Sequence, residues 1–190
     1  LAEISRPTLL TVGVDEELFG RLVPRARLIP GIEVVELAAA AAAAQGARMP
    51  RITVDAGAHM FSAMAFWPGE APCDALISNG LATMAFAVPA AIAAALHEPD
   101  RAVIAFTGDG GLLMCLGELS TAVDQRARIV VIVFNDASLS LIDIKQQQRG
   151  LATRGVRWER PDFARVMEGL GGVGYRADSV AGYKAALSKA

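Results

Sequence analysis

Residues 102–123 read AVIAFTGDGGLLMCLGELSTAV, and this stretch decides the fold. Its first part, 102–107, is apolar without the alternation of a half-buried strand, which predicts a strand covered on both faces, as in a parallel sheet. Glycines then surround a single acid, Asp109. Apolar side chains follow at spacings of four, three and four, which is typical of a helix with one apolar face. These side chains are Leu112, Leu116, Leu119 and Val123.

A second apolar run, RIVVIVFND at residues 128–136, follows that helix. Strand, glycine turn, helix and strand together form a βαβ unit, whose crossover is expected to be right-handed. TGDGG and FNDAS both come at the carboxyl ends of the expected strands, where open α/β sheets bind their ligands. We therefore predict an α/β fold, an open and mostly parallel sheet with helices on both faces.

The remaining segments fit the same architecture. The expected helix VPAAIAAALHE, which begins at Val88, has Pro89 in its first turn, where a missing N–H costs nothing, and it stops before Pro99. Further strands are expected at 8–13 and within 51–59, and a short apolar run followed by a loop begins at residue 74. Helices are expected at about 34–47 and within 88–98, and a helix, a short strand and a helix are expected over 163–190.

Composition restricts the class of protein. Hydrophobic residues make up 53% of the 190, and the net charge of −2 gives no electrostatic footprint for nucleic acid. The apolar stretches are all interrupted well short of about 20 residues, so no membrane span or membrane partner is expected. Cys73 and Cys115 are too few for a disulfide framework, so the reducing cytoplasm is the expected location.

The length is that of one domain. We predict a single domain over 1–190, with a lead-in segment at 1–33 and a core at 34–190. The first residue is not methionine and the last residues read as the middle of a helix, so we expect a fragment of a larger multidomain chain.

Several familiar interpretations of the glycine turn fail. A hairpin turn would not be followed by a helical period. The dinucleotide fingerprint needs a third glycine where Leu113 stands, and a Walker A loop needs Gly-Lys-Ser/Thr. An EF-hand loop needs several acids at alternate positions, whereas Asp109 stands alone.

A site for a phosphate and a cation remains. Gly110 and Gly111 open the expected helix, where N–H groups and the helix dipole favour an anion. Asp109 beside them is a hard oxygen ligand, suited to a magnesium or calcium ion that bridges phosphate oxygens.

The next strand end offers further oxygen ligands. Asn135 carries a side-chain carbonyl, and the turn after it can direct the main-chain carbonyl of Ala137 to the same ion. Asp136 is the rival ligand, although adjacent side chains usually point apart. Because neighbouring parallel strands end at the same edge of a sheet, we expect Asp109 and Asn135 to lie close together.

GDG, 24 further residues and Asn135 together resemble the diphosphate- and metal-binding motif of thiamine-diphosphate-dependent enzymes. DAGAHMF (55–61) resembles the Gly-x-His element that approaches the cofactor in acetolactate-synthase-like enzymes. SNGLATMAFAVPAAIAAAL (78–96) resembles the stretch of that family that holds the aminopyrimidine. The resemblance covers roughly residues 50–175, in order and spacing.

This resemblance implies a thiamine-diphosphate-binding fold, thiamine diphosphate and Mg²⁺ as cofactors, and roles for individual residues. Met84 matches the apolar residue that props the cofactor in its bent form. The implied metal ligands are Asp109, Asn135 and the Ala137 carbonyl. The implied cofactor-binding residues are His59, Ala82, Met84, Gly108, Asp109, Gly110, Gly111, Asn135 and Leu139.

The chain also departs from the family pattern. Alanines stand at 82, 85 and 87, where glycines are common, and Gly111 stands where serine or alanine often follows GDG. Asp136 replaces a frequent second asparagine and adds negative charge near the expected metal. These departures motivate one alternative, a degenerate binding domain without catalysis.

The leading expectation is the cofactor-binding domain of an enzyme, a lyase or transferase, that decarboxylates a 2-oxo acid and joins two substrates as acetolactate synthase does. A simple 2-oxo acid or oxalyl-type decarboxylase is the alternative. The resemblance places the activating glutamate on a separate pyrimidine-binding domain, usually on a second subunit, and implies a homo-oligomer. We therefore expect no catalytic residue in this chain, and no normal turnover from it alone.

Overall fold

The sheet is the centre of the molecule. A computed structural model of the chain describes residues 6–13, 32–44 and 48–190. Within these residues, six strands form one sheet in the order β3-β2-β4-β5-β1-β6, and every neighbouring pair is parallel. The strands are β1 (Thr8–Gly13), β2 (Arg51–Val54), β3 (Ala75–Ile77), β4 (Val103–Gly108), β5 (Ile129–Asn135) and β6 (Val173–Ala177). The predicted α/β fold is confirmed.

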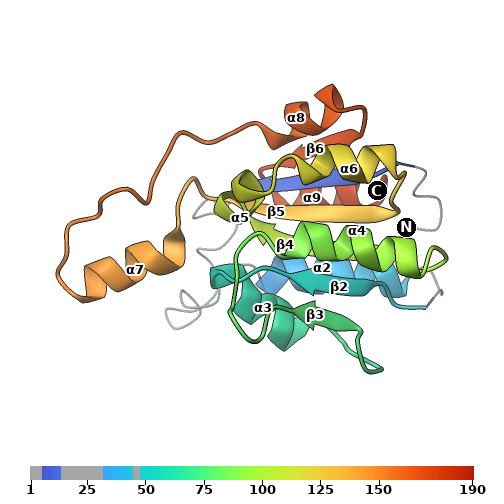
Figure 1. Cartoon of the computed structure of the whole chain (residues 1–190), viewed down its shortest axis with the longest axis horizontal. Helices are drawn as coiled ribbons and strands as arrows, with labels where there is room; N and C mark the ends of the chain where they lie inside the picture. Colours follow the sequence, from blue (N-terminus) through green and yellow to red (C-terminus); the bar gives the residue numbers. More distant parts are fainter. Residues whose placement is uncertain (1–5, 14–31, 45–47) are drawn as a thin grey trace.

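Helices cover both faces of the sheet (Figure 1). Ile104 and Phe106 of β4 pack on one face with α2, α3 and α9, whereas Val103 and Ala105 pack on the other with α4, α5, α6 and α8. The uninterrupted apolar runs therefore have the expected cause, because both faces of the central strands are buried. The helices are α2 (Ile32–Ala43), α3 (Ala58–Phe66), α4 (Ala87–His97), α5 (Asp109–Met114), α6 (Glu118–Asp124), α7 (Ser140–Gln148), α8 (Phe163–Gly169) and α9 (Val180–Leu187).

The predicted βαβ unit is present, with one difference. Strands β4 and β5 are parallel neighbours. Leu112 and Leu119 of the connecting segment are fully buried in the core on one face of these strands. The single helix expected there is divided into α5 and α6, because the main chain leaves helical geometry at Cys115. Gly117, a poor helix former, lies in the interruption.

The first described strand lies inside the sheet. Thr8 of β1 pairs with Val130 of β5 on one side and with Val173 of β6 on the other. Residues 8–13 of the expected lead-in segment therefore belong to the same sheet as the expected core. Residues 14–31 lie outside the described residues, and the division at residue 33 stays a prediction.

Two helices were not expected from the sequence. The main chain turns into α3 directly after the short β2, and α7 stands off one end of the sheet (Figure 1). Residues 149–162 return from α7 to α8 without regular structure. Of the helices described, none has the length and apolar character needed to cross a bilayer.

Candidate cofactor site

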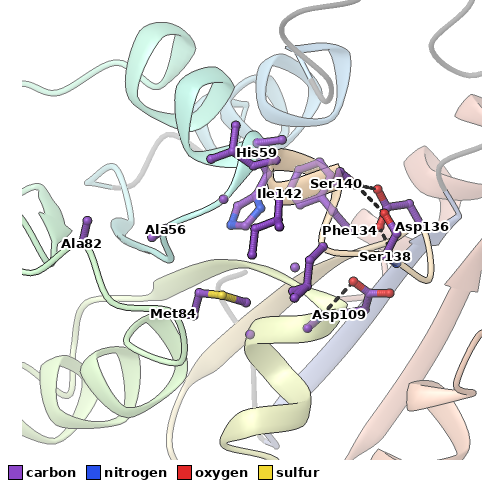
Figure 2. Close-up of a pocket in the computed structure, with 17 residues that line it drawn as sticks. Ala56, His59, Ala82, Met84, Asp109, Phe134, Asp136, Ser138, Ser140 and Ile142 are labelled. Carbon is purple, nitrogen blue, oxygen red and sulfur yellow. Dashed lines mark hydrogen bonds between the residues drawn. The ribbon is translucent and has the colours of Figure 1, made fainter. Parts of the chain in front are cut away.

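A cavity of about 240 Å³ lies at the carboxyl ends of the central strands (Figure 2). Strands β4 and β5 both end at it, and the turns into α3, α5 and α7 complete its wall. The predicted cofactor-binding residues that line it are His59, Ala82, Met84, Gly108, Asp109, Gly110, Gly111 and Leu139. Asn135 does not line this cavity.

Asp109 is the first residue after β4 and is only 1% exposed. Its Oδ1 accepts a hydrogen bond from the Gly110 N–H at 2.8 Å, whereas its buried Oδ2 has no partner. The pKa of the Asp109 carboxyl is raised to about 6, chiefly by burial and also by the nearby Asp136 carboxylate. The Asp109 Oδ2 therefore forms no hydrogen bond with the described residues, although the Ala137 N–H and the Trp158 side chain lie close enough to the carboxyl to lower its pKa.

Asn135 ends the neighbouring strand. Gly108 pairs with Phe134 in the sheet, so Asp109 and Asn135 occupy the next positions along two adjacent strands, as the sequence predicted. The Asn135 Nδ2 donates to the Pro161 carbonyl at 2.9 Å, and its buried Oδ1 has no partner. The side chain lines a second cavity, of about 10 Å³, bordered also by Thr11, Arg160, Pro161, Asp162, Phe163, Arg176 and Asp178.

Ala137 lies two residues further on, in the left-handed region with φ of +58°. Its carbonyl accepts the Trp158 N–H at 3.1 Å, which leaves the second lone pair of that oxygen. Its N–H faces the Asp109 carboxyl and partly offsets the rise in that pKa. The main chain at Ala137 is thus turned toward the end of β4.

Asp136 is engaged by the turn that leads into α7. One carboxylate oxygen accepts the Ser138 N–H at 3.1 Å, and the other accepts the Ser140 hydroxyl (Figure 2). Both serines line the cavity. Both oxygens of Asp136 already have donors, whereas the Asn135 Oδ1 has none, so Asn135 stays the predicted ligand beside Asp109. Sequence reasoning did not identify this role of the two serines.

The glycines of the turn have different reasons to lack a side chain. A Cβ at Gly110 would come within 2.6 Å of the Leu139 side chain and 3.2 Å of Trp158, at the cavity wall. A Cβ at Gly111 would collide with the Asp55 carboxylate. The Gly110 N–H, expected to face a diphosphate, is donated to Asp109 here.

Asp55 is a structural residue that sequence reasoning missed. It is 1% exposed, and its Oδ1 accepts the N–H groups of Phe86 and Ala87, both at 2.6 Å, at the start of α4. Its Oδ2 accepts the Thr107 hydroxyl at 2.5 Å. An acid directly after a strand was the available signal. Asp55 therefore ties β2, β4 and α4 together behind the glycine turn.

His59 lies at the start of α3 with its ring stacked on Phe134, the ring centroids 5.3 Å apart. It is 6% exposed, and burial lowers its pKa to about 4, so the imidazole is neutral at pH 7. Its Nε2 is buried without a partner. Figure 2 shows the ring at the cavity, between α3 and Ile142 of α7.

The segment before α4 supplies the opposite wall. Ala82 and Ala85 have φ of +49° and +63°, in the region that favours glycine, so the alanines follow the glycine-like path of the main chain. The Met84 side chain points into the cavity (Figure 2), and its methyl group lies 3.4 Å from the Cβ position of Gly110. Met84 is thus placed as an apolar support facing the glycine turn.

The residues present fit a cation bound by oxygen ligands. Asp109 Oδ2 and Asn135 Oδ1 are buried acceptors without donors at the ends of adjacent strands, and the Ala137 carbonyl retains a lone pair. In the part of the chain that the structure describes, no cluster of three histidine, cysteine or acidic side chains could hold a metal. One carboxylate, one amide and one main-chain carbonyl suit a hard ion such as Mg²⁺.

A parallel sheet with a glycine turn, an unpartnered carboxylate and a cavity at its strand ends defines an α/β protein that binds a phosphorylated ligand. Residues 55–190 match the family model of the thiamine pyrophosphate enzyme, C-terminal TPP binding domain. The chain belongs to this family. Its cofactor is thus thiamine diphosphate, and the sheet and helices are those of the thiamine-diphosphate-binding fold.

Curated relatives give the branch of the family. The chain is 34% identical over 128 residues to acetolactate synthase of Bacillus subtilis (strain 168), which covers 67% of the chain and 22% of that protein. It is 41% identical over 105 residues to acetolactate synthase isozyme 1 large subunit of Escherichia coli (strain K12), covering 55% and 18%. It is 31% identical over 141 residues to the isozyme 3 large subunit, covering 73% and 25%. The domain is acetolactate-synthase-like, and it spans about a quarter or less of these relatives.

Proposed function

We propose that this domain serves an enzyme that decarboxylates a 2-oxo acid and joins the product to a second carbonyl compound, in the manner of acetolactate synthase. The observation that carries the proposal is a pair of buried acceptors without hydrogen-bond partners in an acetolactate-synthase-like domain: Asp109 Oδ2 at the cavity, and Asn135 Oδ1 at the end of the neighbouring strand. When bound, thiamine diphosphate supplies the carbon nucleophile that attacks the 2-oxo acid.

The residues of this chain bind and orient the cofactor. Asp109, Asn135 and the Ala137 carbonyl would hold Mg²⁺, which neutralises the diphosphate and relieves the cost of the buried Asp109 carboxylate. Leu139 and Met84 face the Gly110 position and would exclude water around the cofactor. Neutral His59 can donate or accept one hydrogen bond at the cavity without adding charge.

The acid that activates the aminopyrimidine is expected from another domain. Among the residues the structure describes, no glutamate lines the cavity, and its acids are Asp109 and Asp136. Both belong to the cation end of the site. We therefore propose that a pyrimidine-binding domain, usually on a second subunit, supplies a glutamate, and that this chain alone has no normal turnover.

Exposed apolar side chains support a missing neighbour. Phe61 and Met64 on α3 are 48% and 42% exposed, and Leu81, before the Met84 wall, is 86% exposed. Met114 at the end of α5 is 62% exposed. Large apolar groups exposed around one site are typical of an interface. We propose that a pyrimidine-binding domain covers them in a homo-oligomer.

The second substrate would decide the enzyme class. An acceptor carbonyl would make the enzyme a transferase, whereas protonation of the product would make it a lyase.

The alternative of a degenerate binding domain without catalysis is not supported by Ala82 and Ala85, because both alanines adopt the positive φ that glycine would adopt. Cys73 and Cys115 are both free, which supports a cytoplasmic location.

Calorimetry tests the binding part of the proposal. Thiamine diphosphate with Mg²⁺ is titrated into the chain and into Asp109→Asn, which has the same shape without the charge. We expect binding to the parent chain and at least a hundredfold weaker binding to the variant, with the variant no less stable, because the lost carboxylate is buried and half unpartnered. ATP is the control ligand. Equal affinity of both proteins for thiamine diphosphate would contradict the proposal.

A mixing experiment tests the missing domain. A pyrimidine-binding domain from an acetolactate synthase is added to the chain with pyruvate, thiamine diphosphate and Mg²⁺. We expect carbon dioxide release only from the mixture, and acetolactate rather than acetaldehyde as product. Robust turnover by the chain alone would refute the proposed division of labour, and acetaldehyde alone would favour the simple decarboxylase.

A further inference from the structure

Residues 156–161, which we call the strap, run along the turn that follows β5. The Val156 carbonyl accepts the Leu139 N–H at 2.9 Å, and Arg157 forms an antiparallel bridge with Ser138. The strap has no helix or long strand of its own. Its main chain is instead held by the main chain of residues at the cofactor cavity.

The strap determines which amide atom of Asn135 is left for a cation. A carbonyl oxygen can only accept, so the Pro161 carbonyl must face the NH₂ group of Asn135, as it does at 2.9 Å. The Asn135 Oδ1 is consequently turned away from that contact, buried and without a donor. Ligands of metals are commonly oriented in this way by groups behind them.

Trp158 contacts the region of the other two expected ligands. Its main-chain N–H donates to the Ala137 carbonyl at 3.1 Å, which helps to hold that residue at its φ of +58°. Its indole packs 3.2 Å from the Cβ position of Gly110, and the buried indole N–H has no partner.

Asp143 of α7 fixes the strap from the other side. The Asp143 side chain is buried, with 8% of its surface exposed, and its Oδ2 pairs with the Arg157 Nη2 at 2.6 Å. Its Oδ1 accepts the Thr153 hydroxyl at 2.7 Å. Asp143 does not line the cavity, so its effect on a bound cation would pass through the strap.

We propose that the strap positions the cation ligands of the cofactor site, with Trp158 and Pro161 orienting Asp109, Asn135 and Ala137 and with Asp143 as the anchor. This inference rests on the proposed cation site. It assigns positioning roles to residues outside the glycine motif. One short segment forms hydrogen bonds with Asn135 and Ala137 and packs beside Gly110, the neighbour of Asp109, and this juxtaposition carries the inference.

Mn²⁺ is the probe, titrated into the chain with thiamine diphosphate present, and the free ion is counted by electron paramagnetic resonance. Asn135→Asp keeps an oxygen ligand but loses the donor to Pro161, and we expect at least tenfold weaker binding although a carboxylate is the stronger ligand. Asp143→Asn and Trp158→Phe are each expected to weaken binding at least threefold.

Glu98→Gln is the matched control, because Glu98 also accepts from two partners, Arg48 and Arg51, but at the opposite end of the sheet. Its affinity for Mn²⁺ should stay within twofold of the parent. Thermal unfolding followed by circular dichroism identifies a variant that has lost its fold. Trp158→Phe, which keeps a packed ring, then decides the matter if Asp143→Asn does not fold.

Tryptophan fluorescence provides a second measurement of Mn²⁺ binding. The protein has two tryptophans, and paramagnetic Mn²⁺ should quench Trp158 but leave the emission that remains in Trp158→Phe, from buried Trp67, nearly unchanged. Binding by the parent with equal affinity in Asp143→Asn and Trp158→Phe would overturn the strap inference alone. No binding of Mn²⁺ by the parent would overturn the proposed cation site and the strap inference with it.

Discussion

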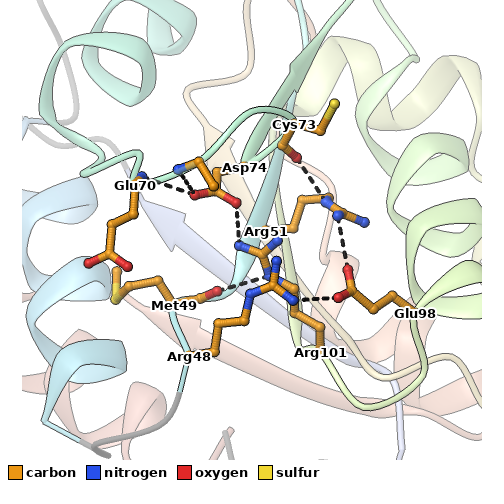
Figure 3. Close-up of polar contacts among 9 residues, drawn as sticks. Arg48, Met49, Arg51, Glu70, Cys73, Asp74, Glu98 and Arg101 are labelled. Atoms are coloured by element: carbon orange, nitrogen blue, oxygen red, sulfur yellow. Dashed lines mark hydrogen bonds and ion pairs between the residues drawn. The ribbon is translucent and has the colours of Figure 1, made fainter.

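The two ends of the parallel sheet handle buried charge in different ways. At the amino ends of β2, β3 and β4, Asp74 is 4% exposed and pairs with Arg101 at 2.7 Å, while Glu98 pairs with Arg48 and Arg51 (Figure 3). The second Asp74 oxygen accepts two main-chain N–H groups, and the Arg101 Nε donates to a main-chain carbonyl. A single nitrogen of Arg101 is left without a partner.

At the carboxyl ends, four side chains each have one buried polar atom that forms no hydrogen bond. They are Asp109, Asn135, His59 and Trp158. Arg101 lowers the pKa of Asp74 to about 2, whereas burial raises that of Asp109 to about 6. Removing one partner of a matched buried pair is costly, whereas unmatched buried groups with shifted pKa values are typical of functional sites. The difference between the two edges of the sheet thus supports the proposed binding site at the carboxyl ends.

The largest expected effect is at the matched end. Asp74→Ala leaves Arg101 buried without its carboxylate, and we expect a loss of about 3 kcal/mol in the free energy of unfolding. Urea denaturation measures it. Arg48→Ala, at an exposed guanidinium, is the control and should cost no more than about 1 kcal/mol. Cofactor affinity of folded Asp74→Ala should be unchanged; a loss of affinity would break the comparison.

A pH effect is expected at the binding end. The pKa of His59 is about 4 in the folded protein and about 6.5 when unfolded, so between these values the unfolded chain binds a proton that the folded protein excludes. Stability therefore falls as pH drops from 6.5 to 4, by roughly 3 kcal/mol. About 2 kcal/mol of this loss falls between pH 7 and pH 5, and His59→Gln should remove it when urea denaturation is compared at these two pH values.

His97 provides the control for that experiment, because it is exposed at the end of α4. His97→Gln should keep the pH dependence of the parent protein. The same slope in His59→Gln and in the parent would show that the imidazole of His59 is charged or exposed, and it would remove His59 from the binding end of the comparison.

Substitution of Gly111 tests whether the main chain at the carboxyl ends is tightly packed against Asp55. A Cβ there must displace Asp55, so Gly111→Ala should cost about 2 kcal/mol in the free energy of unfolding. Gly117→Ala is the matched control, since nothing lies within 4 Å of its Cβ position and its φ is −59°. That variant should be as stable as the parent or slightly more. Equal stability of both variants would contradict the role of Asp55.

The smallest effect sharpens the comparison at one main-chain position. Ala85 has a φ of +63°, so Ala85→Gly should relieve strain and stabilise the fold by about 1 kcal/mol. Ala90→Gly, within α4, should instead destabilise it by about 1 kcal/mol. Thermal unfolding of both variants checks the opposite signs. A destabilised Ala85→Gly would show that this alanine is not strained.

The sequence was sufficient for the architecture because burial leaves a pattern in the residues. The apolar runs in β4 and β5 predicted parallel strands, and the paired positions Gly108 and Phe134 confirm that the two strand ends meet. The leucine spacing after Asp109 predicted which side chains face the core, and it could not show that the axis is interrupted at Cys115. The spacing of apolar residues shows which face of a helix is buried, but not whether the helix is continuous.

The site was predicted in part. Several residues that the sequence predicted to bind the cofactor line one cavity in the structure, although their contacts with the cofactor stay predictions. Among them are His59, Met84, Asp109 and Leu139. The strap was missed because it acts chiefly through main-chain N–H and C=O groups, which leave no pattern of side chains. The direction of the Asn135 amide depends on Pro161, a partner that no local pattern indicates.

The place of β1 in the strand order has a consequence for how this sheet forms. Thr8 pairs with Val130 and Val173, so β1 must wait for more than 110 further residues before either neighbour exists. Contacts so distant along the chain slow folding. During translation β1 would remain an unpaired apolar segment, and a nascent chain of this domain should therefore depend on chaperones until β5 and β6 have left the ribosome.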